Sequence, residues 1–248
     1  MLRITALAAL AAAVGLSAAP AQAQDTPPPD TIVVQTPENE ARKRFNTGND
    51  LLRQEDYEGA LAMFEEGLSL DPTNNRNAYG RALALAQLDR EDDAVEAFEQ
   101  AIALSDAAED AETGTAARRA LGLIMYNRAL GLLAANPLPQ ATAEEALPLL
   151  AVATEGGVEA NQLPYQLARV HNVLGNYDEA ERYAQAAVEA NEGQDDMSAY
   201  YIELGLARMN AGNADGAREA FEMAREGSWS GWAEHYLREL DGDGAAGG

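Results

Sequence analysis

The fold is decided by residues 41–74, which read ARKRFNTGNDLLRQEDYEGALAMFEEGLSLDPTN. Small residues stand at the eighth and twentieth positions of this stretch, Gly48 and Ala60, and an aromatic residue, Phe64, stands at the twenty-fourth. Two antiparallel helices can approach closely only where small residues face each other, and an aromatic ring can fill the space toward a next pair. Pro72 marks the end of the pair. The stretch therefore predicts two helices joined by a short turn.

The same pattern returns further along the chain at a spacing of 34 residues. Residues 75–108 follow directly, and residues 161–194 and 198–231 carry two more copies. The matching positions are Ala82, Ala94, Phe98 and Ala101 in the second copy, Ala168, Gly175, Tyr177, Ala180, Ala184 and Ala187 in the next, and Tyr201, Leu204, Gly205, Gly212, Ala217, Phe221 and Ala224 in the last. Self-similarity at a fixed period is typical of repeat proteins, in which each unit buries its apolar face only against its neighbours.

This repetition resembles the tetratricopeptide repeat family. The resemblance implies an all-α fold, an antiparallel helix-pair solenoid wound into a right-handed superhelix. Repeats 1 and 2 are expected over residues 39–108 and repeats 4 and 5 over residues 161–231.

The stretch between these pairs, residues 109–160, departs from the pattern. An acidic linker is expected over residues 105–114, followed by a long helix over residues 116–135. Thr142 is expected to cap a second helix that runs to about Thr154 and contains Pro148. This region is either a degenerate third repeat or a hinge between two lobes, and the sequence leaves both open.

The two ends of the chain differ from its body. Residues 1–23 have a positive start, an apolar Ala-rich run and a small-x-small cleavage pattern, and therefore predict a secretory signal peptide and a periplasmic protein. Without cysteine the chain cannot be a lipoprotein. Residues 24–38 are Pro-rich and are expected to be disordered, as is the Gly-rich tail 241–248. Residues 232–240 are expected to form a helix that caps the stack.

The chain is strongly acidic, with 41 Asp and Glu against 17 Lys and Arg and a net charge of −24. Such a charge repels nucleic acid, whose binding depends on contacts from Lys and Arg to phosphate. No segment after residue 23 is apolar over the length of a membrane span, so membrane insertion is not expected. High net charge also favours solubility.

No constellation for chemistry is evident. The two histidines, His171 and His235, lie far apart, and there is no cysteine to complete a zinc site. The run that starts at Asp71 lacks the glycine and the closing glutamate of a calcium loop, since Arg76 and Ala82 occupy those places. We expect no cofactor, no metal and no catalytic residue, and we interpret the protein as a scaffold rather than an enzyme.

The resemblance also indicates which side chains line the concave groove of such a stack. Carried over to the four regular repeats, the family's groove positions contain no Asp or Glu. The predicted groove residues are Arg42, Phe45, Asn49, Arg53, Arg76, Tyr79, Tyr165, Arg169 and Asn172, joined by Arg128 if the third unit packs normally. Arg and Tyr are common anchors of protein interfaces, so we expect a protein or peptide partner with an acidic or C-terminal segment. The alternative is that inner helices avoid acid because they pack tightly.

A second contact candidate precedes the repeats. Residues 30–36 read DTIVVQT and resemble the TonB box of outer-membrane transporters. The resemblance implies that Asp30, Thr31, Ile32, Val33 and Val34 add a strand to a sheet edge of an envelope energy-coupling protein. This alternative assigns the protein to envelope machinery coupled through its N-terminal segment.

Overall fold

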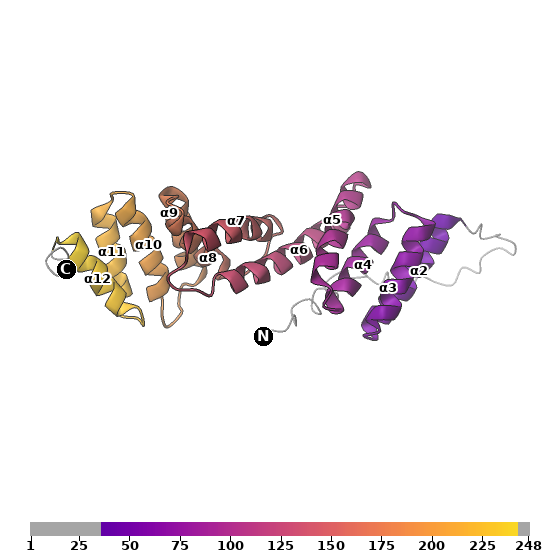
Figure 1. The fold of residues 1–248 in the computed structure, drawn as a ribbon, viewed down its shortest axis with the longest axis horizontal. Helices are drawn as coiled ribbons and strands as arrows, with labels where there is room; N and C mark the ends of the chain where they lie inside the picture. The colour runs from indigo at the N-terminus through magenta and orange to yellow at the C-terminus, as the bar shows by residue number, and fades with distance from the viewer. Residues whose placement is uncertain (1–35, 243–248) are drawn as a thin grey trace, which may run out of the picture. The chain divides into compact units, whose positions relative to one another are not determined.

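The computed structural model describes residues 36–242 of the 248-residue chain. Every regular element in this range is an α-helix, so the all-α prediction is confirmed (Figure 1). The expected signal peptide, the strand-like residues Asp30–Val34 and most of the Gly-rich tail lie outside the described residues. In the described part of the chain, no helix combines the length and the apolar character that crossing a bilayer requires.

The chain divides into two compact units, residues 1–124 and residues 125–248, which we call unit 1 and unit 2. Unit 1 holds helices α2 (Pro37–Arg53), α3 (Tyr57–Leu70), α4 (Asn75–Gln87) and α5 (Glu91–Ala107), and it ends within α6 (Ala111–Leu132). Consecutive helices α2 to α5 pack side by side as two antiparallel pairs (Figure 1). These pairs correspond to the first two repeats predicted from the sequence.

Side-chain caps explain where the helices of unit 1 begin. The backbone N–H three residues into α2, α3 and α4 donates a hydrogen bond to Thr36, Asp56 and Asn74, at 3.3, 3.0 and 3.0 Å. Such caps satisfy a donor that a helix start would otherwise leave without a partner. Helix α2 therefore begins at Pro37, within the segment expected to be disordered.

The core of unit 1 is arranged around the fully buried ring of Phe64 on α3. A Cβ atom added at Gly48 on α2 or at Gly80 on α4 would lie only 2.6 or 2.4 Å from this ring. The two glycines therefore let α2 and α4 close on the same aromatic side chain, which fills the gap between successive pairs as the repeat pattern predicted.

The irregular third region differs in detail from its prediction. The residues expected as an acidic linker are mostly helical, because α5 continues to Ala107 and α6 already begins at Ala111. Asp110 causes this early start, since its carboxylate accepts a hydrogen bond of 3.1 Å from the backbone N–H of Thr113. Thr142 is not the cap of the following helix either, because α7 (Gln140–Glu155) begins two residues earlier, after Pro139.

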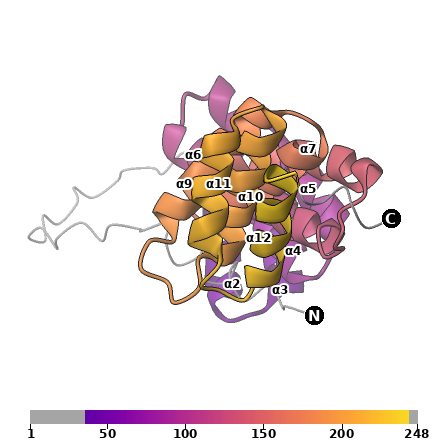
Figure 2. The same cartoon turned by 90° about the vertical axis from the view of Figure 1, so that its left-hand side faces the viewer.

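Unit 2 contains the end of α6, then α7, α8 (Leu163–Val173), α9 (Tyr177–Ala190), α10 (Ser198–Asn210), α11 (Ala214–Ala224) and α12 (Ser230–Leu240). Figure 2 shows α10, α11 and α12 side by side at the end of this unit. The buried ring of Phe221 on α11 lies against Gly205 on α10, where an added Cβ would be 2.3 Å away. Ala233 and Leu237 of α12 join the same core cluster, so this helix covers the end of the last pair.

Candidate functional site

In unit 1 the predicted groove residues lie on two neighbouring helices. Helix α2 carries Arg42, Phe45, Asn49 and Arg53, and helix α4, which packs against α2, carries Arg76 and Tyr79. The three arginines are exposed, with 61% of the Arg53 side chain and 59% of the Arg76 side chain accessible. Phe45 and Asn49 are partly buried. We call the set Arg42, Phe45, Asn49, Arg53 and Arg76 the basic inner face.

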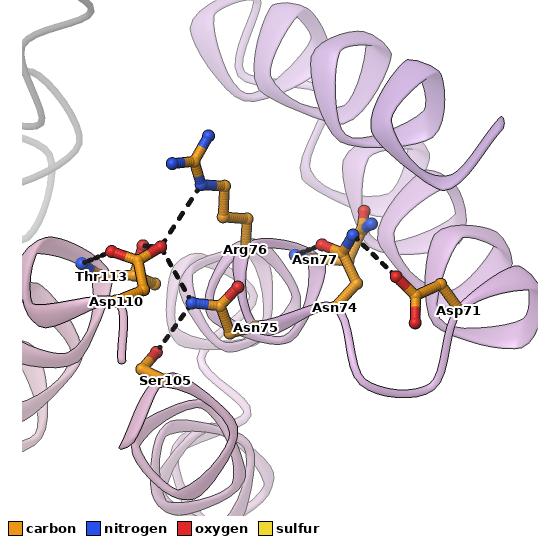
Figure 3. Close-up of polar contacts among 8 residues, drawn as sticks. All are labelled: Asp71, Asn74, Asn75, Arg76, Asn77, Ser105, Asp110 and Thr113. Carbon is orange, nitrogen blue, oxygen red and sulfur yellow. Dashed lines mark hydrogen bonds and ion pairs between the residues drawn. The ribbon is translucent and has the colours of Figure 1, made fainter. Parts of the chain in front are cut away.

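Polar contacts restrain each arginine only loosely. Arg42 donates a hydrogen bond of 3.2 Å to the side chain of Asn39, and Arg53 pairs with Asp50 one turn earlier in the same helix. Arg76 Nε lies 3.5 Å from a carboxylate oxygen of Asp110 (Figure 3). Exposed pairs of this kind contribute about 0–1 kcal/mol, so an incoming carboxylate can replace them at little cost.

Asp110 itself is held more firmly than its arginine partner. The side chain of Asn75 donates to Asp110 at 3.0 Å and to the hydroxyl of Ser105 at 3.2 Å, and Thr113 donates its hydroxyl to Asp110 at 2.9 Å (Figure 3). Partial burial alone would raise the pKa of Asp110, but these hydrogen bonds, the Thr113 backbone N–H and the charge of Arg76 lower it to about 2. This carboxylate therefore joins α4 to α6 and pairs with Arg76, and the hydrogen bond from Asn75 to Ser105 joins α4 to α5.

Tyr79 does not offer its ring to a groove. Only 6% of the residue is exposed, its ring lies 6.0 Å from that of Phe98, and burial raises its pKa to about 12. Its buried hydroxyl has no hydrogen-bond partner among the described residues. The groove assignment of Tyr79 is therefore corrected to a core position, because α4 is covered by α2, α3 and α5.

In unit 2 the predicted groove residues Tyr165, Arg169 and Asn172 all lie on α8. Arg169 donates to the backbone carbonyls of Leu133 and Ala135, both at 3.2 Å, and packs over the ring of Tyr165 at 5.7 Å. These carbonyls follow the end of α6, where a cation is favoured by the helix dipole. Arg169 thus fastens the end of α6 to α8 and is not free to anchor a partner.

Asn172 joins α8 to α10 through Glu203, an acidic residue that was not among the predicted groove residues. Its side-chain nitrogen donates to the carboxylate of Glu203 at 2.8 Å and to the Glu203 backbone carbonyl at 3.0 Å. Burial raises the pKa of Glu203, and the hydrogen bond from Asn172 and the charge of Arg169 oppose this rise. The sequence does hold a signal for this residue, because Glu203 is one acid within the apolar run YYIELGLA, residues 200–207.

The model of the tetratricopeptide repeat family matches residues 45–112 and 165–231, which is more than half of the chain. The chain belongs to this family. The prediction made from the repeats is confirmed, and the two matched segments cover the regular pairs on either side of the third region. Tetratricopeptide repeats are scaffolds for protein interaction, because stacked pairs create extended surfaces.

Several solved structures are similar to this chain at low sequence identity. YrrB, described as a TPR protein with an unusual peptide-binding site, is 19% identical, with 80% of this chain and 92% of that chain covered and a TM-score of 0.46. MamA from Desulfovibrio magneticus RS-1 is 19% identical over 77% of this chain and 97% of that chain, with a TM-score of 0.43. PilW, a type IV pilus biogenesis factor, is 18% identical over 83% and 87%, with a TM-score of 0.40. No curated protein matches the sequence.

The other candidates occupy separate places in the described part of the chain. Arg128 lies on the part of α6 that belongs to unit 2 and is partly buried. His171 stacks on Tyr183 with the ring centres 5.4 Å apart, and burial lowers its pKa, while His235 lies on α12 with Glu239 at 4.0 Å. Within residues 36–242, no three His, Asp or Glu side chains are grouped so that they could hold a metal ion.

Proposed function

We propose that this protein is a periplasmic scaffold that binds an acidic segment of a partner protein on the basic inner face of unit 1. The observation that carries the proposal is the exposure of Arg42, Arg53 and Arg76 on two adjacent helices of a chain whose net charge is −24. A local positive patch attracts acidic segments, whereas the rest of the negative body repels them.

The chemistry of the face fits a carboxylate-bearing peptide. A guanidinium group can bind a carboxylate through two parallel hydrogen bonds, and each arginine here has only weak exposed contacts to lose. Phe45 is partly buried beside them, with its ring 6.2 Å from that of Phe64, and offers a fixed apolar surface. The face therefore suits a segment in which acidic residues flank an apolar one.

The signal-like residues 1–23 support the periplasmic location. Cell fractionation tests it: a protein in the periplasmic fraction that starts at Gln24 would agree, and an unprocessed cytoplasmic protein would contradict it.

Binding to the face is tested with a fluorescein-labelled octapeptide of alternating Glu and Leu, by fluorescence anisotropy with the full chain. The double variant Arg53→Glu with Arg76→Glu should weaken binding at least tenfold, which corresponds to about 1.4 kcal/mol. The melting temperature should change little because both side chains are exposed.

The matched control is Arg225→Glu. Arg225 lies in unit 2, is exposed, and pairs with an acidic residue one turn earlier, as Arg53 does. This variant should bind the peptide within twofold of the unaltered protein. If the double variant also binds within twofold, the basic inner face is not the binding surface. A peptide with Gln in place of Glu should bind weakly to every variant.

A further inference from the structure

Unit 1 contains a cleft between helix α3 and the turn that leads from α4 to α5. Its volume is about 370 Å³, at the lower end of the range of about 300–1,000 Å³ that is typical of ligand sites. Helix α3 contributes one wall, and the turn contributes the other. We call this place the acidic cleft, and its lining residues are Glu58, Leu61, Ala62, Glu65, Leu88 and Arg90. It shares no residue with the basic inner face.

The wall that α3 contributes combines apolar and acidic side chains on one face of the helix. Its four lining residues follow the spacing i, i+3, i+4 and i+7, which places them on the same side of an α-helix. Leu61 and Ala62 therefore lie between Glu58 and Glu65. The two glutamates are separated by about 10 Å along the axis, since each residue advances a helix by about 1.5 Å. The cleft thus has an apolar middle with a carboxylate at either end of this wall.

Backbone hydrogen bonds hold the opposite wall in place. The N–H of Leu88 donates to the carbonyl of Ala84, and the N–H of Arg90 donates to the carbonyl of Leu85, both at 3.1 Å. Asp89, between them, takes the left-handed conformation with φ of 58° and reverses the chain toward α5. Because the backbone fixes this wall, the cleft exists before a ligand arrives, and a ligand does not have to order it.

The charge that remains in the acidic cleft is negative. Arg90 donates from Nε to the carboxylate of Asp93 at 2.7 Å, so a residue outside the lining already balances the arginine. Neither Glu58 nor Glu65 forms a side-chain hydrogen bond or an ion pair within residues 36–242. Long Lys and Arg side chains lay their methylene groups on apolar surface and keep the charged end beside polar groups. Such side chains match both the apolar middle and the carboxylates of this lining.

We propose that the acidic cleft binds a basic segment of a partner protein in which two Lys or Arg residues stand three positions apart. In a polyproline II segment, residues at this spacing lie on the same side and are about 9 Å apart, which matches the separation of Glu58 and Glu65. The site goes beyond the proposed function, because it lies on other residues of unit 1 and selects the opposite charge. Either proposal can therefore fail while the other stands.

The test measures fluorescence anisotropy of a fluorescein-labelled peptide amide, Lys-Pro-Pro-Lys, with the full chain. Salt at about 0.15 M shortens the Debye length to about 8 Å, so that distant charges of the acidic chain contribute little. The peptide should bind in a saturable way with a Kd below about 1 mM. The matched control is Pro-Lys-Lys-Pro, which has the same composition and charge but adjacent lysines. It should bind about fivefold more weakly or worse, because only one of its lysines can reach a glutamate from the same side.

Variants of the carboxylates test the source of the affinity. Glu58→Gln with Glu65→Gln should weaken binding of Lys-Pro-Pro-Lys about tenfold or more, which removes its preference over Pro-Lys-Lys-Pro. The matched control is Glu96→Gln with Glu99→Gln, since both residues are exposed on α5 of the same unit and lie outside the lining. This control removes the same charge and should leave the affinity within about threefold.

A variant that fills the cleft separates binding in the cleft from adhesion to an acidic surface. Ala62→Gln places a longer, uncharged side chain between the glutamates, and the fold should tolerate it because Ala62 is exposed on a helix. It should weaken binding about fivefold or more without a change in the melting temperature. Ala151→Gln, at an exposed position of α7 in unit 2, is the control and should bind as the unaltered protein does.

Several outcomes would overturn the proposal. Equal binding of Pro-Lys-Lys-Pro, or unchanged binding in Ala62→Gln, would show general attraction to an acidic surface. Equal losses in the two pairs of Glu→Gln substitutions would remove the special role of Glu58 and Glu65. Putrescine that displaces the labelled peptide as well as unlabelled Lys-Pro-Pro-Lys does would assign the cleft to small amines and not to a protein segment.

Discussion

In units 1 and 2 the first helix of each regular repeat is followed, two residues after its end, by a residue with positive φ at the fifteenth position, but the residue types differ. In unit 1 this position is Glu55 or Asp89, with φ of 62° and 58°. In unit 2 it is Gly175 or Gly212, with φ of 76° and 83°. A left-handed conformation is easy for glycine and costs about 1 kcal/mol for a side chain with a Cβ atom. The turn geometry is therefore set by the helix packing, and unit 1 keeps acidic residues there at some cost.

The two units also differ in how the first helices of their repeats use charged side chains. Unit 1 exposes Arg53 and Arg76, whereas unit 2 uses Arg169 to fasten the end of α6 and holds Glu203 by a hydrogen bond from Asn172. Side chains on the first helix of a repeat are thus exposed to solvent in one unit and bound to a neighbouring helix in the other. Repeat position alone does not tell whether a side chain is available to a partner.

The largest effect is expected from removing the buried phenylalanine ring at the core of each unit. Phe64→Ala and Phe221→Ala should each lower the free energy of unfolding by about 3–5 kcal/mol, because both rings are fully buried. Since stacked repeats interact mainly with their neighbours, hydrogen exchange should rise in α2–α5 for Phe64→Ala and in α10–α12 for Phe221→Ala.

The control for this comparison is Met223→Ala, because Met223 is 59% exposed and its truncation should change stability by less than about 0.5 kcal/mol. Equal increases of exchange in both units after either Phe substitution would contradict the division and show that the chain unfolds as one cooperative body.

A smaller effect, with opposite pH dependence in the two units, is expected from their restrained carboxylates. The pKa of Asp110 falls from 3.8 to about 2 on folding, so its ionised form stabilises unit 1 above pH 3.8, and this contribution is lost as the pH falls toward 2. Asp110→Asn should cost at most about 2 kcal/mol at pH 7 and almost nothing at pH 2. Urea unfolding of variant and unaltered protein at each pH measures the difference.

Glu203 should behave in reverse. Its pKa is raised above 4.5 in the folded chain, so the stability that it contributes is complete below pH 4.5 and is lost as the pH rises through the folded-state pKa. Glu203→Gln should therefore stabilise the protein at pH 7 relative to the unaltered chain, and the gain should shrink at pH 4. A gain that is the same at both pH values would show that ionisation of Glu203 is not the cause.

The smallest effect concerns the turns with positive φ. Gly212→Ala should cost about 1 kcal/mol, although an added Cβ would meet nothing within 4 Å, because the cost is purely conformational. Glu55→Gly should gain about 0.5 kcal/mol, since the relief of backbone strain exceeds the added entropy of the unfolded chain. Thermal unfolding checks both.

Gly131→Ala is the matched control for the turns, because Gly131 is helical on α6, has open space around it and has no positive φ. It should stabilise by about 0.5–1 kcal/mol. A loss of stability in Gly131→Ala, or no loss in Gly212→Ala, would show that backbone conformation does not explain these effects.

Much of the fold could be predicted from local sequence. Small and aromatic residues at fixed positions predicted the helix pairs, and the rings of Phe64 and Phe221 do fill the spaces beside Gly48, Gly80 and Gly205. The third region was less accurate, because its helix boundary depends on Asp110. That side chain accepts hydrogen bonds from Asn75, 35 residues earlier, as well as from nearby Thr113.

By itself the sequence determined the period of the repeats, the helix pairs and the strong negative charge, because these follow from side-chain type and spacing. Only the tertiary structure decided which inner side chains remain available. Tyr79 is buried among three helices. Arg169 donates hydrogen bonds to backbone carbonyls 34 and 36 residues earlier in the chain, and Glu203 accepts one from Asn172, 31 residues earlier. Pairings of this kind depend on how helices pack against one another, and no local pattern along the chain encodes them.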